Sequence, residues 1–503
     1  MTAPIAWLQG GAPERVALLG ADGAITYAGL LQAVEVLANA LRAERVRVLA
    51  SRLDNGPAWA VLDLACWHAG AVHVPLPGFF SDAQVSHVLA AAGVDALAHP
   101  VSVDGDGDGC VLPLPGSAVA LRRLANRQVP IHPGTVKISF TSGSTGQPKG
   151  ACLSGASLAG VAGGVAAALE PLGVERHLAA LPLPVLLENV AGLYAPLAAG
   201  AACVLLPLQA VGLSGSSGFD AGVLQQAVER WRPDSTIVLP QMLRAWAGRR
   251  SATGRSTDAA PRFVAVGGAA VGADTIRAAR AAGLPAHEGY GLTEAGSVQT
   301  LNLPGSDLPG SVGRALPHAR LRTSANGELE VAGSPMLGYL GEAASAPGDW
   351  WPTGDLGRID GAGFVHLTGR LRNVLVTAFG RNVSPEWVET ALQSQPAIGL
   401  AAVFGEARPG LCAVIWPSRT GLPRGVLEAA VYTANATLPD YARIHHWITA
   451  TLPFDAASGM ATDNGRPRRE AIERHHSAAL AAGYDHSAAL AAGCRQGIRN
   501  ALS

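Results

Sequence analysis

Lysine is almost absent from this 503-residue chain, in which Lys137 and Lys149 are the two lysines and arginine supplies nearly all of the positive charge. Charged residues of both signs are scarce at 15%, and the formal net charge is −1. A chain without a basic excess is not expected to bind nucleic acid or an anionic membrane surface. A general bias towards arginine explains the composition, but both lysines flank one glycine-rich segment, which suggests that a compact ammonium is needed there.

Cysteine is also scarce, since the six cysteines form no CxxC pair and no cluster with histidine at metal-ligand spacing. We expect buried, reduced thiols instead of a disulfide framework or a zinc site. The first residues lack a basic segment followed by an apolar core, so no secretory signal is expected and the predicted location is the cytoplasm. Asp104, Asp106 and Asp108 imitate a calcium loop, but Pro115 stands where a bidentate glutamate is required, which indicates a polar surface loop.

Charge is missing altogether from residues 189–219, which is long enough to raise the question of a membrane span. Pro196, Pro207 and several glycines interrupt this run. A helix, a turn and a buried strand are therefore expected there, and no membrane span is predicted.

The stretch ISFTSGSTGQPKG, residues 138–150, combines an apolar start with three glycines, several hydroxyls and Lys149. Glycines allow backbone N–H groups to approach an anion, hydroxyls add donors, and the lysine adds positive charge. It is not a Walker loop, because Lys149 precedes Gly150 and is not followed by serine or threonine. A flexible linker is the plain alternative, and the apolar segment before the glycines favours a phosphate-binding loop.

Three regions follow from the periodicity of apolar residues. Helical and β-branched runs alternate over residues 27–120, which is typical of an α/β sheet with crossover helices, whereas residues 311–369 look β-rich. A smaller α/β unit follows. The predicted domains are residues 1–369 and 370–475, and the alanine-rich tail 476–503, which repeats HSAALAAG, is expected to be a helical or disordered appendage.

Four motifs occur in a fixed order: TSGSTGQPKG at 141–150, YGLTE at 290–294, TGDLG at 353–357 and Gly-Arg at 369–370. This order resembles the adenylate-forming superfamily of acyl-CoA synthetases, peptide-synthetase adenylation domains and luciferases, over nearly the whole chain. The resemblance implies an α/β fold with a large N-terminal domain, containing α/β sheets and a β-rich subdomain, and a small mobile α+β C-terminal domain. It also implies ATP, Mg²⁺ and CoA as co-substrates and cofactor.

The resemblance assigns roles to individual residues. Lys149 and the segment Thr141, Ser142, Gly143, Ser144, Thr145 and Gly146 match the phosphate loop. Glu294 matches the magnesium-binding glutamate, Thr293 an α-phosphate contact, and Tyr290 with Gly291 the segment against adenine, where an aromatic ring can stack. Gly267, Gly268 and Ala269 match a turn that approaches the base and acyl chain, and Asp355 with Arg370 matches the pair that holds the ribose hydroxyls.

Further motifs resemble the long-chain acyl branch of the superfamily. LPLPVLLENV places Val185 where the branch has histidine and Glu188 at its glutamate, so both are predicted to contact substrate. The uncharged helix Val190–Ala199 is predicted to line an apolar tunnel, although a plain core helix fits equally well. The expected substrate is a medium- or long-chain fatty acid, with CoA as acceptor or, alternatively, the phosphopantetheine of a carrier protein.

The C-terminal domain of this superfamily rotates about the residue two after Gly-Arg, which here is Arg372, and would bring in a loop at Phe379 and Gly380. The lysine that reaches the acyl carboxylate during adenylation falls on Arg466. Arginine spreads its charge over a planar fork, so three readings are open. Arg466 substitutes for the lysine, adenylation is slow or needs a rearrangement, or the protein binds nucleotide without activating an acid.

Overall fold

The computed structural model describes residues 11–101, 110–112, 114, 119–125, 128–141, 148–214, 218–254, 259–345, 348, 350–378, 381–408, 410–462 and 467–481. Several residues singled out above lie outside this description: the aspartates 104–108 with Pro115, the loop residues Ser142, Gly143, Ser144, Thr145 and Gly146, Phe379 and Gly380, Arg466, and the tail from residue 482.

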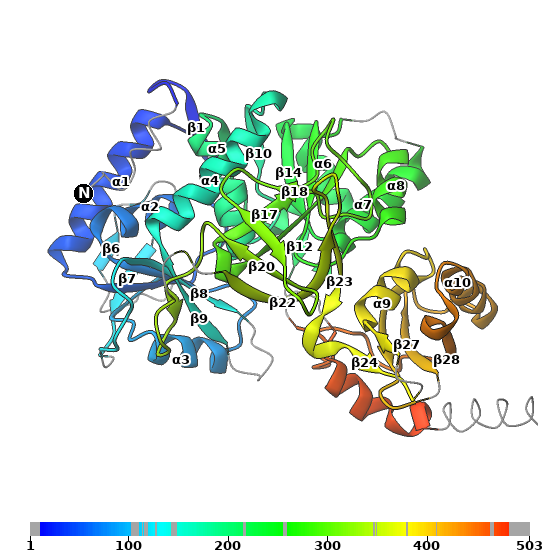
Figure 1. Ribbon diagram of the computed structural model, residues 1–503. Helices are drawn as coiled ribbons and strands as arrows, with labels where there is room; N and C mark the ends of the chain where they lie inside the picture. Colours follow the sequence, from blue (N-terminus) through cyan, green and yellow to red (C-terminus); the bar gives the residue numbers. More distant parts are fainter. Residues whose placement is uncertain are drawn as a thin grey trace, which may run out of the picture.

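An eight-stranded sheet forms the N-terminal side of the molecule, coloured blue to cyan in Figure 1. Its core runs parallel through β4–β3–β5, and β8 joins β4 in parallel while pairing antiparallel with β9. The strands in spatial order are β21 (Gly338–Tyr339), β9 (Lys149–Ser154), β8 (Thr135–Thr141), β4 (Val72–Pro75), β3 (Val48–Ser51), β5 (Ala96–Pro100), β7 (Val119–Arg123) and β6 (Cys110–Leu112). The predicted phosphate loop is thus the connection of the β8–β9 hairpin.

A nine-stranded sheet lies beside it and supplies one wall of the cavity described below. Its strands in spatial order are β18 (Arg314–Ala315), β17 (Ser297–Leu301), β16 (Ala286–Leu292), β15 (Phe263–Val266), β14 (Ser235–Val238), β10 (Arg176–Leu178), β11 (Ala202–Val204), β1 (Val16–Gly20) and β2 (Gly23–Thr26). β14, β15 and β16 are parallel, so their carboxyl ends meet at one edge. The green helices α6 (Ala221–Trp231), α7 (Pro240–Thr253) and α8 (Ala273–Ala281) gather on the right of this sheet in Figure 1.

Helices that touch both sheets account for the low charge of the chain. α2 (Pro57–Ala69) is buried almost all round, and it packs on α1 (Tyr27–Ala43) and contacts β8 and β1. A helix that is apolar on every side belongs in the interior of a protein. α4 (Gly155–Leu169) likewise contacts β9 of one sheet and β17 of the other.

One helical segment, Gly155–Leu172, is long and apolar enough to cross a membrane by length and composition alone. A third of that segment, 33%, is buried inside the protein, and core helices pass the same test. The contacts of α4 with two sheets account for its buried residues. The first part of the uncharged run, residues 189–204, forms the predicted helix, turn and buried strand: the π-helix η3 (Glu188–Tyr194), α5 (Ala195–Ala198), a turn and β11.

The β-rich region is a four-stranded antiparallel sheet, as its short strands and turns predict. Its strands are β19 (Arg320–Thr323), β20 (Glu328–Ala332), β22 (Trp351–Ile359) and β23 (Val365–Arg370). β22 pairs with β23 so that Asp355 lies opposite Arg370. This register brings together two motifs that are separate in the sequence.

The C-terminal unit, yellow to red in Figure 1, has its own core. α9 (Pro385–Gln393) and α10 (Arg424–Ala436) accompany the sheet β26 (Ile398–Phe404), β27 (Leu411–Pro417) and β28 (Ile444–Thr449). The predicted boundary at residue 475 is wrong, because a helix continues over 469–481. Leu480 on that helix is buried in the same apolar cluster as Ile472 and Phe454. The first residues of the predicted tail, 476–481, therefore belong to the domain and not to an appendage.

Of the five cysteines that the structure describes, four follow the sequence prediction, and Cys494 lies outside the described residues. Cys66, Cys152, Cys203 and Cys412 are buried free thiols, whereas Cys110 is exposed at the edge strand β6. Burial raises the pKa of the Cys152 thiol, which keeps it in the neutral form. The prediction of buried thiols is therefore wrong for Cys110, since an edge strand presents a side chain to solvent.

Candidate active site

A cavity of about 1740 Å³ lies along one face of the nine-stranded sheet. Ser235, Thr236 and Ile237 of β14 line it, with Leu239 just after the strand, together with Phe263, Ala265 and Val266 of β15. Ser235, Ile237 and Leu239 are two residues apart and so share one face of the strand. Four residues from Ser235 to Leu239 correspond to roughly 13 Å along the strand at about 3.3 Å per residue.

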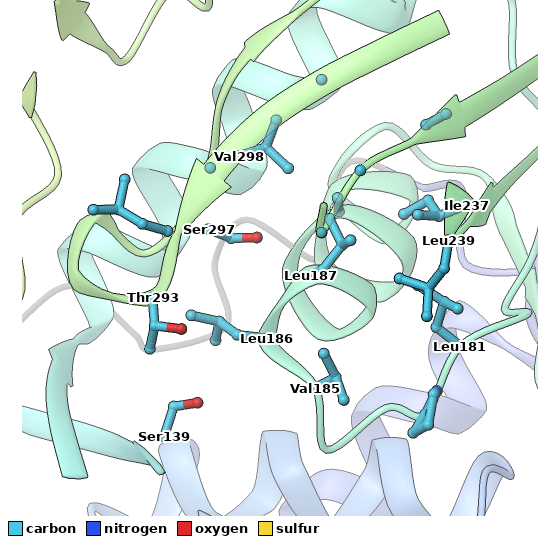
Figure 2. Close-up of a pocket in the computed structure, with 18 of the residues that line it drawn as sticks. Ser139, Leu181, Val185, Leu186, Leu187, Ile237, Leu239, Thr293, Ser297 and Val298 are labelled. Atoms are coloured by element: carbon cyan, nitrogen blue, oxygen red, sulfur yellow. The ribbon is translucent and has the colours of Figure 1, made fainter. Parts of the chain in front are cut away.

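A second part of the lining comes from the segment Leu181–Leu187 and the helix that follows it. Ala191 and Ala195 of this helix line the cavity, in agreement with the predicted tunnel helix. Figure 2 shows Val185, Leu186 and Leu187 between two groups of side chains: the hydroxyls of Ser139, Thr293 and Ser297 on the left, and the aliphatic Leu181, Ile237 and Leu239 on the right. The cavity therefore has a hydroxyl-bearing side and an apolar side.

Turns that contain glycine line the cavity at the carboxyl ends of the parallel strands β15 and β16. Gly267, Gly268 and Ala269 line it directly after β15, and Gly268 has φ +83°, a left-handed conformation that favours glycine. A Cβ on Gly291 would come within 2.2 Å of the Ser297 carbonyl oxygen, so only glycine fits there. This is the edge at which parallel α/β sheets bind ligands.

Tyr290 lies at the same edge with its ring against the cavity and its hydroxyl directed away. The hydroxyl donates to Asp355 Oδ2 at 2.7 Å. Burial and the neighbouring Asp355 carboxylate raise the pKa of Tyr290, so the phenol stays protonated as a donor. The ring is thereby held in one orientation.

The predicted pair of Asp355 and Arg370 is present. Arg370 Nε lies 2.6 Å from Asp355 Oδ1, and Arg370 lines the cavity. Asp355 lies behind this arginine and is not among the residues that line the cavity. Its direct contact with a ribose stays a prediction.

The predicted cation and the predicted metal ligand lie on one side of the cavity, joined by Tyr339. Lys149 Nζ bonds Glu342 Oε1 at 3.0 Å and lies 5.2 Å from the Tyr339 ring centroid. The Tyr339 hydroxyl donates to Glu294 Oε1 at 2.5 Å, and burial followed by this bond raises the pKa of Tyr339. Lys149, Glu294 and Tyr339 all line the cavity, as does Thr293.

Sequence reasoning missed Tyr339 and Glu342, although they contact two predicted site residues. Tyr339 belongs to β21, which pairs with β9 so that Tyr339 lies opposite Ala151. This strand pairing spans almost 190 residues of sequence, and no local pattern announces it. The available signal was a tyrosine in a segment flanked by Gly338 and Gly341.

Of the two predicted substrate contacts, Val185 lines the cavity and Glu188 does not. Val185 is half-buried and lines the cavity. Glu188 is fully buried and does not line it, because Oε1 lies 3.0 Å from His177 Nε2 and Oε2 accepts from the Leu181 N–H at 3.0 Å. Glu188 therefore shapes the wall from behind, whereas His177 itself lines the cavity.

The suggestion that Lys137 serves the phosphate loop is also wrong. Its ammonium is buried and lies 2.8 Å from Asp63 Oδ1 on α2, with further bonds to Asn189 and the Tyr194 hydroxyl. Burial raises the pKa of Asp63, but the Lys137 charge and a bond from His73 outweigh burial and hold that pKa below its usual range. This lysine ties β8 to α2 and to the tunnel helix.

A large domain with a glycine-lined, polar edge next to an apolar cavity, followed by a small C-terminal domain, defines the class of adenylate-forming enzymes. Residues 7–340 match the family described as AMP-binding enzyme, and residues 372–488 match the AMP-binding enzyme C-terminal domain. The chain belongs to this family of AMP-binding enzymes. The second match begins at residue 372, the position of the predicted hinge.

The chain is similar to several curated CoA ligases. It is 30% identical over 428 residues to a feruloyl-CoA synthase of an Amycolatopsis species, covering 79% of this chain and 84% of that protein. It is 27% identical over 523 residues to a long-chain-fatty-acid–CoA ligase of Mycobacterium bovis, covering 85% and 86%. Family and relatives support CoA ligase activity through an acyl-adenylate.

Solved structures agree in fold. An anthranilate CoA ligase in complex with anthranoyl-AMP has a TM-score of 0.76 at 20% identity, covering 95% of this chain and 98% of that chain. The amide bond synthetase McbA from Marinactinospora thermotolerans has a TM-score of 0.73 at 25% identity, covering 93% and 99%. The predicted two-domain α/β architecture is confirmed.

Proposed function

We propose that this enzyme activates a medium- or long-chain fatty acid with ATP and transfers the acyl group to CoA. The observation that supports this most is one continuous cavity with hydroxyls, a lysine and a carboxylate on one side and aliphatic side chains on the other. A carboxylate head at the polar side leaves the chain of the acid against apolar surface, where its burial is favourable.

The chemistry needs two steps. A carboxylate oxygen of the acid bonds to the α-phosphorus of ATP as the bond to the bridging oxygen breaks and pyrophosphate leaves. The thiol sulfur of CoA, its proton released to solvent, then bonds to the acyl carbon as AMP leaves. Holding the reactants in line and stabilising charge on the phosphates account for most of such catalysis.

In this proposal the residues at the polar side divide the work. Lys149 holds the departing phosphates through its charge, and the Thr293 hydroxyl donates to the α-phosphate. The ring of Tyr290 lies against adenine, and Arg370 holds the ribose together with Asp355. Each position lies in or directly behind the cavity wall.

Magnesium fits the same side by its donor chemistry. Mg²⁺ prefers carboxylate and phosphate oxygens, and the Glu294 carboxylate lines the cavity beside Thr293. Glu294 would hold the ion, which supplies charge neutralisation to the phosphates when bound. The Tyr339 hydroxyl fixes one oxygen of that carboxylate and so orients it.

An aryl acid is the second candidate for the substrate. It is favoured by the similarity to a feruloyl-CoA synthase and by polar groups, His177 and Ser235, that interrupt the apolar lining. Purified enzyme incubated with ATP and CoA separates the candidates: acyl-CoA and AMP form with decanoate or dodecanoate under the fatty-acid proposal, and with 4-hydroxycinnamate under the aryl proposal. If neither class of acid gives acyl-CoA, both proposals for the substrate are contradicted.

Two further alternatives concern the acceptor and turnover. An enzyme that loads a carrier protein would form its thioester with phosphopantetheinylated carrier and not with free CoA. A nucleotide-binding protein without turnover, motivated by Arg466, would bind ATP without acid-dependent exchange of pyrophosphate. We place the ligase in the cytoplasm as part of the same proposal.

A further inference from the structure

We infer that the end of the cavity remote from the adenylate edge is a hydrogen-bonding subsite, built on Ser235 and His177, that selects acids with a distal hydroxyl group. The inference rests on the proposed function and deepens it, because it names a feature of the substrate. The substrate would be a linear or aromatic acid that carries a hydroxyl group able to donate a hydrogen bond at this end of the cavity.

The position of the subsite follows from the strand register. His177 on β10 lies opposite Ser235 on β14. Ser235 is the first residue of β14, so this pair lines the cavity near the amino-terminal end of that strand. The nucleotide edge lies at the carboxyl ends of the neighbouring strands, at Gly267 and Tyr290. The two ends are therefore separated by roughly 13 Å of strand, with Ile237 and Ala265 between them.

The polar groups at this end form a chain anchored behind the wall. Ser235 Oγ lies 2.9 Å from His177 Nδ1, and His177 Nε2 lies 3.0 Å from Glu188 Oε1. The other Glu188 oxygen accepts from the Leu181 N–H at 3.0 Å. Both ring nitrogens are thus engaged, which fixes the imidazole and, through it, the serine hydroxyl.

Ser235 retains capacity for a substrate. A serine hydroxyl donates one hydrogen bond and accepts two, and its bond with the histidine uses the donor or one acceptor position. In either case a lone pair of Oγ is left to accept from a substrate hydroxyl. An apolar chain end at this place would cover polar groups without a compensating bond, which disfavours it.

The neighbouring helix is shaped around this chain. A Cβ on Gly192 in the π-helix η3 would come within 1.9 Å of Glu188 Oε1 and 2.8 Å of His177 Nε2. Any larger residue would displace the pair. Single π-turns occur often at functional sites, and here the turn leaves the space that the Glu188–His177 bond occupies.

The test compares kcat/KM for two matched pairs of acids: 4-hydroxycinnamate with cinnamate, and 10-hydroxydecanoate with decanoate. We expect the wild type to prefer the hydroxylated member of at least one pair about tenfold, the size of one hydrogen bond. Which pair shows the preference distinguishes an aromatic from a linear acid. A ratio of one or below in both pairs overturns the inference.

Single substitutions show which residues cause the preference for the hydroxylated acid. Ser235→Ala removes the contacting oxygen and should lower the ratio to about one, whereas Ile237→Val, midway along the same strand, should change both members of a pair alike. His177→Leu should lower the ratio through the positioning of Ser235, and His177→Asn should restore part of it, because its amide lies where Nδ1 lay. A ratio unchanged in Ser235→Ala contradicts the subsite.

The failure of the subsite can be told apart from failure of the proposed function. If unhydroxylated acids are activated and no variant changes the ratio, the subsite is wrong and the ligase proposal stands. If no acid of either pair supports pyrophosphate exchange, the proposed function is overturned and the subsite falls with it. Thermal unfolding of each variant confirms that a lost ratio does not come from lost folding.

Discussion

At the scale of single residues, two acidic side chains buried in the large domain behave in opposite ways. Asp63 meets the Lys137 ammonium, which outweighs burial and keeps its pKa low. Glu288 on β16 accepts a single bond, from the Val271 N–H at 3.1 Å, and burial raises its pKa to about 8. A paired carboxyl stays ionised in the interior, whereas one bonded to a neutral donor takes up a proton.

Glu288→Gln should alter how stability depends on pH. The wild-type carboxyl remains protonated in the folded state while the unfolded chain ionises above about pH 4.5, so its contribution to stability falls as pH rises towards 8. The glutamine variant lacks this loss, and at pH 8 it should be more stable than the wild type by about 4 kcal/mol. Urea unfolding at pH 5, 6, 7 and 8 measures the difference.

The control for this series is Glu428→Gln, which changes an exposed carboxyl on α10. Its difference from the wild type should stay constant over the same pH range. Parallel pH profiles for wild type and Glu288→Gln would contradict the raised pKa of Glu288.

At the scale of elements, the helices and strands of both domains were largely predictable, because apolar periodicity and turn residues are local signals. The alternation of helices and strands predicted over residues 27–120 is present, for example as α1, β3, α2 and β4. Contacts between residues far apart in the chain could not be predicted from the sequence. Lys137 lies next to the phosphate loop in sequence, yet its partner Asp63 is 74 residues away on α2.

The same dependence on distant pairing explains which residues of the candidate site were predicted and which were missed. The residues predicted to bind the nucleotide belong to sequence motifs, whereas Tyr339 comes close to Glu294 through the pairing of β21 with β9, which no motif announces. Glu188 was misplaced because its motif position does not reveal that His177, eleven residues earlier, turns it away from the cavity.

Two adjacent glycines in α4 offer a matched test of packing. A Cβ on Gly164 would lie 2.0 Å from His318 Nδ1, whereas a Cβ on Gly163 would meet nothing within 4 Å. Gly164→Ala should destabilise the protein by about 1–3 kcal/mol through overpacking. Gly163→Ala should stabilise it by about 0.5–1 kcal/mol through helix propensity. Equal unfolding midpoints for the two variants would show that α4 does not pack on His318 in this way.

At the scale of the whole molecule, the two domains meet where the predicted hinge lies. Arg372 lies in the short helical turn η6 (Leu371–Asn373) after β23 and lines the cavity. A Cβ on Gly272 of the large domain would come within 2.9 Å of Thr390 Cγ2 on α9, so the domains approach closely there. Rotation of the small domain would have to separate this contact.

Arg372→Pro should impair the second half-reaction more than the first, because proline fixes φ and prevents the change of backbone angle that rotation requires. Thioester formation should fall at least about tenfold further than pyrophosphate exchange. Arg372→Ala, which removes the charge but keeps backbone freedom, is the control. Equal losses of both half-reactions in Arg372→Pro would argue against a hinge at this residue.

Acid-dependent ATP–pyrophosphate exchange tests the central claim most directly, since it reports formation of the acyl-adenylate alone. With a panel of fatty and aryl acids, the wild type should catalyse exchange, and Lys149→Ala should lower it about 100-fold by removing the charge beside the leaving phosphates. Arg466→Lys, measured alongside, should leave exchange in place if the arginine is a working substitute. Exchange with no acid in the wild type, or full exchange in Lys149→Ala, would contradict the account.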